Sequence, residues 1–341
     1  MWSPFCFQGV ARSIGLTLAT PEPYDPGVRH LFVSDPIDSF LVDKDTTIAF
    51  MREADRRGHQ VFSAEAETLA FAAGAPHASV CRVRLREGDP WYEALPSSEL
   101  PLGHFDVVWM RKDPPYDLNY FFAAHLLELS PAPTLVVNSP RGLRDVAEKL
   151  FVLRFPELCP ETLISRRVEE LLAFREKLGG EMVVKPIGGC GGEGVFHLRP
   201  EDPNTRALLD MVTAHGSQYQ IAQRYIPEIR QGDKRIILVE GEPVGAVLRV
   251  PQHWESRANF HAGGAAVKAE LRDRDREICA AIGPSLVEHG ILFAGIDVIG
   301  DWLTEVNVTS PTGIREINEL DGVRLEVLVL DAVERRVVAS S

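Results

Sequence analysis

The feature that most constrains this chain is the alternation of short β-rich runs with helical segments through its first half. Strands separated by helices predict a mostly parallel, doubly wound sheet, with functional loops after the carboxyl ends of the strands. Asp35, Arg111 and Asn138 each follow such a run. The expected strands are residues 30–34, 60–63, 80–85, 106–110 and 134–137, and the expected helices are residues 45–57 and 116–129.

Helix-end signals divide the first half further. Asp45 or Thr46 is the expected N-cap of the first helix, and Gly58 is its expected end. Residues 143–155 also have a helical pattern, which Pro156 and Pro160 close. These prolines predict a domain junction.

The second half is richer in hairpins, which favours an α+β arrangement. Its turn signals are glycine-rich, as in the sequence Glu-Gly-Glu-Pro at residues 240–243. The expected strand pairs are residues 182–185 with 195–198, 234–239 with 244–250, and 292–299 with 303–308; the expected helices are residues 205–215, 272–289 and 323–337.

Charge and composition exclude several classes of protein. The 341 residues suggest two or three domains, and 49 acidic against 36 basic side chains give a formal charge of −13. Nucleic acids and anionic membranes both need a basic face, so neither is an expected partner. No apolar run reaches the ~18 residues of a membrane helix. The five scattered cysteines are typical of reduced thiols in the cytoplasm.

Residues 1–28 differ from the rest of the chain. They contain four prolines and no lysine, and they show no periodic apolar pattern. We expect them to be a poorly ordered extension that precedes the first strand.

The strongest chemical signal is a hairpin that carries Asp297, Glu305 and Asn307. Residues i and i+2 of a strand share a face, so Glu305 and Asn307 point the same way. Asp297 joins them if it pairs with Glu305, which we expect to require an odd turn such as residues 300–302. Two carboxylates and an amide oxygen suit Mg²⁺. The alternative is a solvated hairpin edge, although a carboxylate among apolar residues is costly without a partner.

A glycine-dense loop follows Lys185 at the end of a predicted strand. A lysine beside many unobstructed backbone N–H groups favours contact with phosphate oxygens. The loop returns into a strand, so it is neither a Walker A loop nor a dinucleotide fingerprint, and a flexible surface hairpin remains the alternative. Cys190 within it has no surrounding histidine or aspartate pattern and is interpreted as a small filler. The loop glycines are Gly188, Gly189, Gly191, Gly192 and Gly194.

Three arginines lie in the second half of the chain: Arg235, Arg249 and Arg257. Arg257 stands two residues before Asn259. Arginine suits bidentate capture of carboxylate and phosphate groups. Residues 251–266 lack periodicity and contain Pro, Gly, His and Trp, which predicts a mobile lid. Each arginine alone is more typical of a solvated surface charge, so only the cluster is informative.

From about residue 31 to residue 337 the sequence resembles the bacterial glutathione synthetases of the ATP-grasp superfamily. The specific motifs are Val-Ser-Asp-Pro-Ile at 33–37, Met-Arg-Lys-Asp-Pro-Pro-Tyr-Asp at 110–117, Asn-Ser-Pro-Arg-Gly-Leu-Arg-Asp at 138–145, Glu-Lys-Leu at 148–150, Gly-Asp-Lys-Arg at 232–235 and Asn-Val-Thr-Ser-Pro-Thr-Gly-Ile-Arg-Glu at 307–316. The hairpin and glycine loop are shared widely among ATP-grasp enzymes, whereas the other segments are narrower.

The resemblance implies an ATP-grasp fold preceded by a doubly wound, Rossmann-like domain. Its divisions would be residues 29–146 for substrate binding, 147–224 for the central ATP-binding domain, and 225–341 for the C-terminal domain. The implied reaction joins γ-glutamylcysteine to glycine through an acyl phosphate, with ATP converted to ADP and phosphate, as the second step of glutathione biosynthesis. A cytoplasmic homo-oligomer, a tetramer or a dimer, is implied as well.

The resemblance also implies roles for individual residues. Lys149 and Lys185 would hold ATP phosphates, and Asp297, Glu305 and Asn307 would hold two Mg²⁺ ions, or Mn²⁺. Adenine would meet the hinge residues Gln223, Tyr225 and Ile226, largely through backbone groups. The catalytic set would be Arg235, Arg257 and Asn259, and the substrate set would be Asp35, Arg111, Arg249, Arg257, Ser310, Thr312 and Gly313.

Departures from the family pattern concentrate in the expected lid. His253 and Trp254 stand where the family usually carries two glycines, and Ala265 stands where a basic residue is usual. Two other readings remain open: an ATP-grasp ligase for a different carboxylate, and a non-catalytic ATP-binding protein of the synapsin type. The intact Lys149, Lys185, Asp297, Glu305 and Asn307 count against the second.

Overall fold

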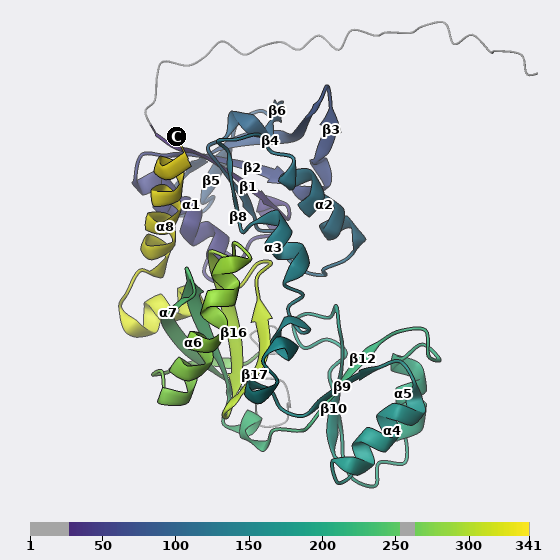
Figure 1. Cartoon of the computed structure of the whole chain (residues 1–341). Coiled ribbons are helices and arrows are strands. Elements are labelled where there is room, and N and C mark those ends of the chain that lie inside the picture. The colour runs from purple at the N-terminus through teal and green to yellow at the C-terminus, as the bar shows by residue number, and fades with distance from the viewer. Residues whose placement is uncertain (1–26, 253–262, 341) are drawn as a thin grey trace, which may run out of the picture.

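Three β-sheets organise the chain in a computed structural model, which describes residues 27–252 and 263–340 (Figure 1). The sheets follow one another along the sequence, and each has helices packed against it. Within the described ranges, no helix has the length and apolar content needed to cross a membrane.

The N-terminal sheet has a parallel centre and an antiparallel edge. Strands β2, β1, β7 and β8 lie side by side in parallel, as predicted for a doubly wound sheet. Strand β4 pairs antiparallel with β2 and continues into an edge formed with β3, β5 and β6, three strands that were not predicted. The strands are β1 Arg29–Ser34, β2 Gln60–Glu65, β3 Ala70–Ala72, β4 Ala75–Leu85, β5 Tyr92–Ala94, β6 Ser98–Pro101, β7 Val107–Met110 and β8 Leu135–Val137.

Helix α1 (Thr46–Arg56) connects β1 to β2, and helix α2 (Leu118–Glu128) connects β7 to β8; helix α3 (Pro140–Asp145) follows β8. The predicted cap of α1 is confirmed, because the Asp45 side chain accepts a hydrogen bond from the backbone N–H of Thr47 at 2.6 Å. Gly58 follows the helix with φ of 78°, a left-handed conformation that glycine adopts without strain.

The middle sheet is antiparallel, in the order β11-β10-β12-β9. Its strands are β9 Thr162–Ser165, β10 Met182–Pro186, β11 Phe196–Leu198 and β12 Gln220–Gln223. Helices α4 (Val168–Lys177) and α5 (Thr205–Val212) pack on it, and Leu171, Met182 and Leu209 belong to their common core. This region lies apart from the N-terminal sheet in Figure 1.

The C-terminal sheet is antiparallel and has two different faces. Ile236 and Leu238 point into the core that includes Ile278 and Ile282 of α6, while Ile237 and Val239 point to the opposite side. The order is β15-β14-β13-β16-β17, with β13 Asp233–Val239, β14 Glu242–Val250, β15 Ala265–Lys268, β16 Phe293–Ile299 and β17 Trp302–Asn307. The helices are α6 Asp273–Glu288, α7 Ile314–Asp321 and α8 Leu325–Ser340.

One helix prediction was wrong in extent, and helix α7 was not predicted. Residues 143–155 do not form one helix: α3 ends at Asp145, and only a short 3₁₀ turn follows at Phe151–Arg154. The chain leaves helical geometry between them because the Glu148 carbonyl accepts a hydrogen bond from Val306 N–H at 3.0 Å, which ties the segment to β17. The predicted helix at residues 323–337 is α8, and α7 before it was missed.

One buried asparagine joins the N-terminal and C-terminal sheets. Asn138 follows β8, and its side chain donates to the carbonyls of Phe293 (2.8 Å) and Val308 (3.0 Å). Its amide oxygen accepts from the N–H groups of Leu292 (2.9 Å) and Phe293 (3.0 Å). The Asn138 side chain therefore uses both its donors and both its acceptor positions to hold the start of β16 and the end of β17 against the first sheet.

The chain returns at its end to the first helix, because α8 packs beside α1 (Figure 1). Glu53 of α1 is fully buried and accepts hydrogen bonds from Arg56, Arg57 and Arg324. Arg57 also pairs with Asp331 of α8 at 2.8 Å. A single carboxylate therefore gathers three guanidinium groups at the junction of the two helices.

This junction predicts acid sensitivity. Hydrogen bonding to Arg56 and Arg57 outweighs burial and lowers the pKa of Glu53 from 4.5 to about 2. Because the folded-state pKa lies below the ordinary value, the stabilisation is fully present above pH 4.5 and is lost as the pH falls through about 2. We expect Glu53→Gln to lower the free energy of unfolding at pH 7 by about 3 kcal/mol, the scale for breaking a buried ion pair.

Denaturant unfolding from pH 7 downward measures this difference, which should shrink as the medium becomes more acid. Asp55→Asn, an exposed carboxylate of the same helix, is the matched control and should change stability by at most ~0.5 kcal/mol. A constant difference between wild type and Glu53→Gln at all pH values would contradict the role given to the Glu53 charge.

Candidate active site

The hairpin β16–β17 brings Asp297 and Glu305 directly opposite each other, and Gly295 opposite Asn307. The expected pairing is confirmed, but the expected odd turn is wrong. Trp302 pairs with Ile299 and Leu303 with Val298, so the turn has two residues, and Thr304 is an extra residue in β17. This β-bulge restores the parity that the short turn would otherwise break.

The bulge residue also contacts the strand that it faces. The Thr304 hydroxyl donates to the carbonyl of Asp297 at 3.1 Å, which fixes the bulge against β16. Thr304 lines the same cavity as Glu305. The sequence analysis missed this residue, since nothing in the local pattern distinguishes a bulge from a longer turn.

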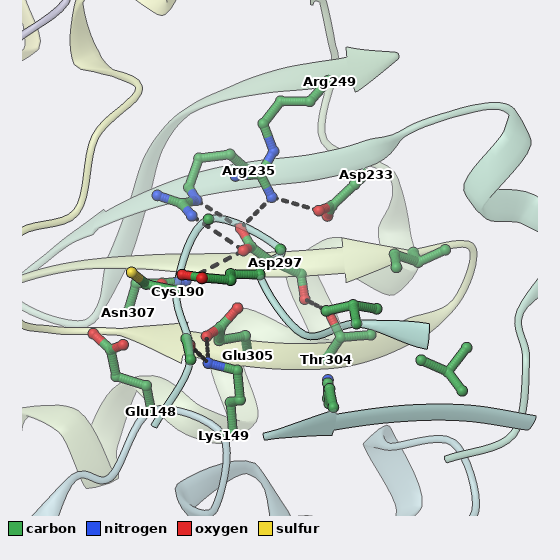
Figure 2. Close-up of a pocket in the computed structure, with 18 of the residues that line it drawn as sticks. Glu148, Lys149, Cys190, Asp233, Arg235, Arg249, Asp297, Thr304, Glu305 and Asn307 are labelled. Carbon is green, nitrogen blue, oxygen red and sulfur yellow. Dashed lines mark hydrogen bonds and ion pairs between the residues drawn. The ribbon is translucent and has the colours of Figure 1, made fainter. Parts of the chain in front are cut away.

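Asp297 is 5% exposed and is shared by two arginines (Figure 2). Arg235, opposite it on β13, donates from Nε to Oδ1 at 2.6 Å and from a terminal nitrogen to Oδ2 at 3.1 Å. Arg249 on β14 reaches Oδ1 at 2.8 Å. Burial alone would raise the pKa of Asp297, but the charges of Arg235 and Arg249 outweigh it and hold the pKa well below its usual range.

A second carboxylate lies beyond Arg249. Asp233 pairs with Arg249 across β13 and β14, at 2.5 Å between Oδ2 and the guanidinium (Figure 2). Its Oδ1 is buried and has no hydrogen-bond partner in the part of the chain that is described. Burial raises the pKa of Asp233 to about 6, against the opposing effect of Arg249. Asp233 was not predicted as a site residue, although it lies in the Gly-Asp-Lys-Arg motif.

Glu305 pairs with a lysine from outside the sheet. Lys149 Nζ lies 2.8 Å from Glu305 Oε1 and also donates to the carbonyl of Gly189 in the glycine loop. Burial alone would lower the pKa of Lys149, but Glu305 outweighs it and raises the pKa. The lysine therefore joins the hairpin to the loop of the middle sheet.

Its neighbour Glu148 was missed as a site residue, despite its place in the Glu-Lys-Leu motif. Glu148 Oε1 accepts hydrogen bonds from the N–H groups of Val308 (3.0 Å) and Thr309 (3.2 Å) and from the Thr309 hydroxyl (2.9 Å). Burial and the nearby charge of Glu305 raise the pKa of Glu148. Glu148 thus holds the start of the segment that follows β17.

Lys185 is the next-to-last residue of β10 and lines the same cavity from the middle sheet. Its side chain makes no hydrogen bond or ion pair with any described residue, and burial lowers its pKa against the effect of Glu305. Gly191 and Gly192 in the following loop have φ of 61° and 78°, a region that disfavours other side chains. A lone ammonium group beside such a loop is suited to an anionic ligand.

The far wall of the cavity comes from the end of β12 and the residues after it. His197 on β11 stacks on Tyr225 with ring centroids 3.9 Å apart and planes 11° apart. The Gln223 side chain donates to the Thr162 hydroxyl at 2.9 Å. Ile226 lies beside them in the lining.

The cavity between the middle and C-terminal sheets has a volume of about 490 Å³. It collects most of the predicted site residues: Lys149, Lys185, Gly189, Gly191, Gly192, Gln223, Tyr225, Ile226, Arg235, Arg249, Asp297, Glu305, Asn307, Ser310 and Thr312. Gly188, Gly313, Asp35 and Arg111 are not among its lining residues. Arg257 and Asn259 lie outside the described residues.

Four predicted residues have other surroundings. Asp35 pairs with Lys112 and accepts from the N–H of Asp113 at 2.8 Å. Gly313, with φ of 120°, precedes α7, and an added Cβ would lie 3.2 Å from Arg235 Cγ. A Cβ on Gly188 would have only the Tyr116 carbonyl near it, at 3.9 Å. Arg111 is buried, and its guanidinium lies over the rings of Phe50 in α1 and Phe293 in β16.

The donor set on the hairpin fits a hard divalent cation. Asp297 and Glu305 supply carboxylate oxygens from paired positions, and Asn307 supplies an amide two residues from Glu305. Each carboxylate has a cationic partner, Arg235 and Arg249 for one and Lys149 for the other. A bound metal ion would therefore share these oxygens with, or take them from, the side-chain cations.

Comparisons with known proteins identify the family to which the chain belongs. Residues 28–144 match the model of the prokaryotic glutathione synthetase N-terminal domain, and residues 148–322 match the model of the prokaryotic glutathione synthetase ATP-grasp domain. The glutathione synthetase of Brucella melitensis is 46% identical over 304 residues, which cover 89% of this chain and 97% of that protein. The glutathione synthetase of Vibrio cholerae is 42% identical over 313 residues, covering 91% and 98%.

Solved structures support the fold alone. The D-cycloserine synthetase DcsG superposes with a TM-score of 0.61 at 14% identity, covering 90% of this chain and 99% of that one. The ATP-grasp ligase PsnB complexed with a minimal precursor gives a TM-score of 0.58 at 18% identity, covering 90% and 98%. Since both family models and relatives above 40% identity span most of the chain, this protein belongs to the prokaryotic glutathione synthetase family.

Proposed function

We propose that this protein joins γ-L-glutamyl-L-cysteine to glycine and makes glutathione, with ATP converted to ADP and phosphate. The observation that carries the proposal is the single cavity in which Lys149, Lys185, Arg235 and Arg249 surround the paired carboxylates of Asp297 and Glu305. Such a site has cations for an anionic nucleotide and oxygens for its metal ions. The relatives at 42 to 46% identity carry the name of this activity.

ATP is proposed to enter between the middle and C-terminal sheets. Lys149 and Lys185 would bind its phosphates, with N–H groups of Gly189, Gly191 and Gly192 beside them. Lys185 supports this role because it has no counter-ion among the described residues. Adenine would meet the backbone of Gln223, Tyr225 and Ile226, next to the stacked His197 ring.

Asp297, Glu305 and Asn307 are proposed to hold two Mg²⁺ ions, or Mn²⁺. When bound, these ions would neutralise charge on the phosphates of ATP. Arg249 and Lys149 are paired with these carboxylates in the structure, and both cations also line the cavity that substrate anions would enter.

The need to activate the cysteinyl carboxylate gives a role to the remaining residues of the site. A carboxylate is a poor electrophile, so the cysteinyl carboxylate first takes the γ-phosphoryl group of ATP and becomes an acyl phosphate. That step needs positioning and charge cancellation, which Arg235 and Arg249 would supply with Arg257 and Asn259. The glycine amine then attacks the acyl carbon and phosphate leaves. Ser310, Thr312 and Gly313 would bind substrate, and residues 251–266 would exclude water.

We also propose a domain division, an oligomeric state and a cellular compartment for this protein. We keep the division into residues 29–146, 147–224 and 225–341, with residues 1–28 as an extension and a homo-oligomer as the assembly. A location in the cytoplasm is supported by the free thiols in the described ranges, which are those of Cys81, Cys159, Cys190 and Cys279.

Phosphate release tests the reaction itself. With Mg²⁺, ATP and γ-glutamylcysteine, we expect sustained release only after glycine is added, with one glutathione formed per phosphate. Equal or faster turnover with another amino acid in place of glycine, or with another carboxylate in place of γ-glutamylcysteine, would point to a different ATP-grasp ligase. ATP binding without any bond formation would identify a non-catalytic protein.

The metal assignment predicts an altered cation requirement. Glu305→Gln removes one carboxylate from the pair, so we expect kcat to fall by about 10²-fold or more and the Mg²⁺ concentration for half-maximal rate to rise. The matched control is Asp301→Asn in the hairpin turn, which pairs with exposed Arg272 and lies outside the cavity lining. A Glu305→Gln enzyme with unchanged Mg²⁺ dependence would remove Glu305 from the metal site.

Arg257 is proposed to stabilise charge that develops as phosphate transfers. If this contact strengthens in the transition state, Arg257→Ala should lower kcat by roughly 10²-fold or more, and Arg257→Lys should restore the rate only partly. The affinity for ATP should change little, because Lys149 and Lys185 remain. A normal kcat with a raised KM for γ-glutamylcysteine would assign Arg257 to substrate binding instead.

A further inference from the structure

Arg111 is a buried cation that is not among the residues lining the cavity. It follows β7, its backbone N–H donates to the Val33 carbonyl at 2.7 Å, and its residue is 4% exposed. The guanidinium lies over the rings of Phe50 (5.6 Å) and Phe293 (5.8 Å), which belong to α1 and β16. Elements of the N-terminal and C-terminal sheets therefore enclose it from both sides.

Among the described residues, this arginine differs from its neighbours in having no direct ion pair with a carboxylate. Arg235 and Arg249 both pair with Asp297, whereas no described carboxylate lies within ion-pair distance of Arg111. Burial lowers the pKa of Arg111, although the charges of Asp45 and Asp113 oppose that effect. A buried charge without a direct ion pair costs stability, so folding alone does not explain an arginine here.

Its hydrogen bonds lead to the segment after β17. Nε donates to the Thr47 hydroxyl of α1 at 3.1 Å, and a terminal nitrogen donates to the Pro311 carbonyl at 3.3 Å. The next carbonyl, of Thr312, accepts from Arg235 at 3.0 Å. Two arginines thus hold two successive carbonyl groups.

The same segment is held at its start by Glu148, which accepts from Thr309 N–H. Between these anchors, Ser310 and Thr312 line the cavity. The fork of Arg111 spans two elements at once, since one nitrogen is fixed on α1 and another on the segment. Movement of the N-terminal sheet would therefore be transmitted to Ser310 and Thr312.

We propose that Arg111 is a positioning residue that holds the segment from Thr309 to Gly313 so that it can bind an amino-acid substrate, without touching the substrate itself. This proposal rests on the proposed function and changes the role expected for Arg111 from the sequence. The supporting geometry is the fork between Thr47 and Pro311 and the absence of Arg111 from the cavity lining.

The test separates substrate positioning from folding and from charge. In Arg111→Met, a side chain of similar length without the charge, we expect the KM for γ-glutamylcysteine or glycine to rise about tenfold. The KM for ATP should stay within about twofold, and the melting temperature should be unchanged or higher because an unpaired buried charge is gone. Arg111→Lys should remain defective, since an ammonium group cannot span both acceptors.

A pair of threonines provides a control that leaves the arginine in place. Thr47→Val removes the acceptor of Nε, and we expect it to raise the same KM about threefold. The neighbouring Thr46 is buried too, but its hydroxyl has no partner in the described structure. Thr46→Val should therefore leave every KM unchanged, and these two variants decide the question if Arg111→Met fails to fold.

Three results would overturn the proposal: unchanged KM values in both Arg111→Met and Thr47→Val, a parallel rise in the KM for ATP, or full rescue by Arg111→Lys. They are distinguishable from failure of the proposed function, which would show as absence of glutathione formation by the wild-type protein. With an active wild type, the variants report on Arg111 alone.

Discussion

The carboxylate of Asp297, held between Arg235 and Arg249, is the interaction on which the site depends. It connects β13, β14 and β16 on one face of the C-terminal sheet, and its register is fixed by the strand pairing that sets Asp297 opposite both Arg235 and Glu305. A buried ion pair of this kind adds little net stability, but removal of one partner leaves a charge uncompensated. Loss of either arginine would therefore leave part of the Asp297 charge without its partner.

Other cations of the cavity are also paired with carboxylates. Lys149 is paired with Glu305, and Arg249 with both Asp233 and Asp297, so the described cations mostly have internal partners before any ligand binds. Lys185 is different, because its ammonium group has no such partner among the described residues and its pKa is lowered by burial.

Segments distant in sequence are brought together by a few polar side chains that each make several hydrogen bonds. Asn138 joins β8 to β16 and the end of β17, Glu148 holds the residues after β17, and Glu53 gathers arginines from α1 and the start of α8. Each is buried or nearly so, and each uses its acceptors on groups that would otherwise lack a partner. These contacts couple the N-terminal sheet to the cavity, and Arg111 continues the same connection to the segment around Pro311.

The sequence alone determined the parallel centre of the first sheet, the hairpins of the second half and the carboxylate pair, because these follow from periodicity, turn residues and residue type. The family was recognisable from short motifs with unusual residue combinations. Local pattern did not show the bulge at Thr304, the break after Asp145 or the surroundings of Asp233 and Arg111, since each depends on partners that are far away in the chain. Distant parts of the chain decide which face of a sheet a strand residue points to, whether a charge is buried and where a helix ends. Only the tertiary structure shows which parts of the chain pack together.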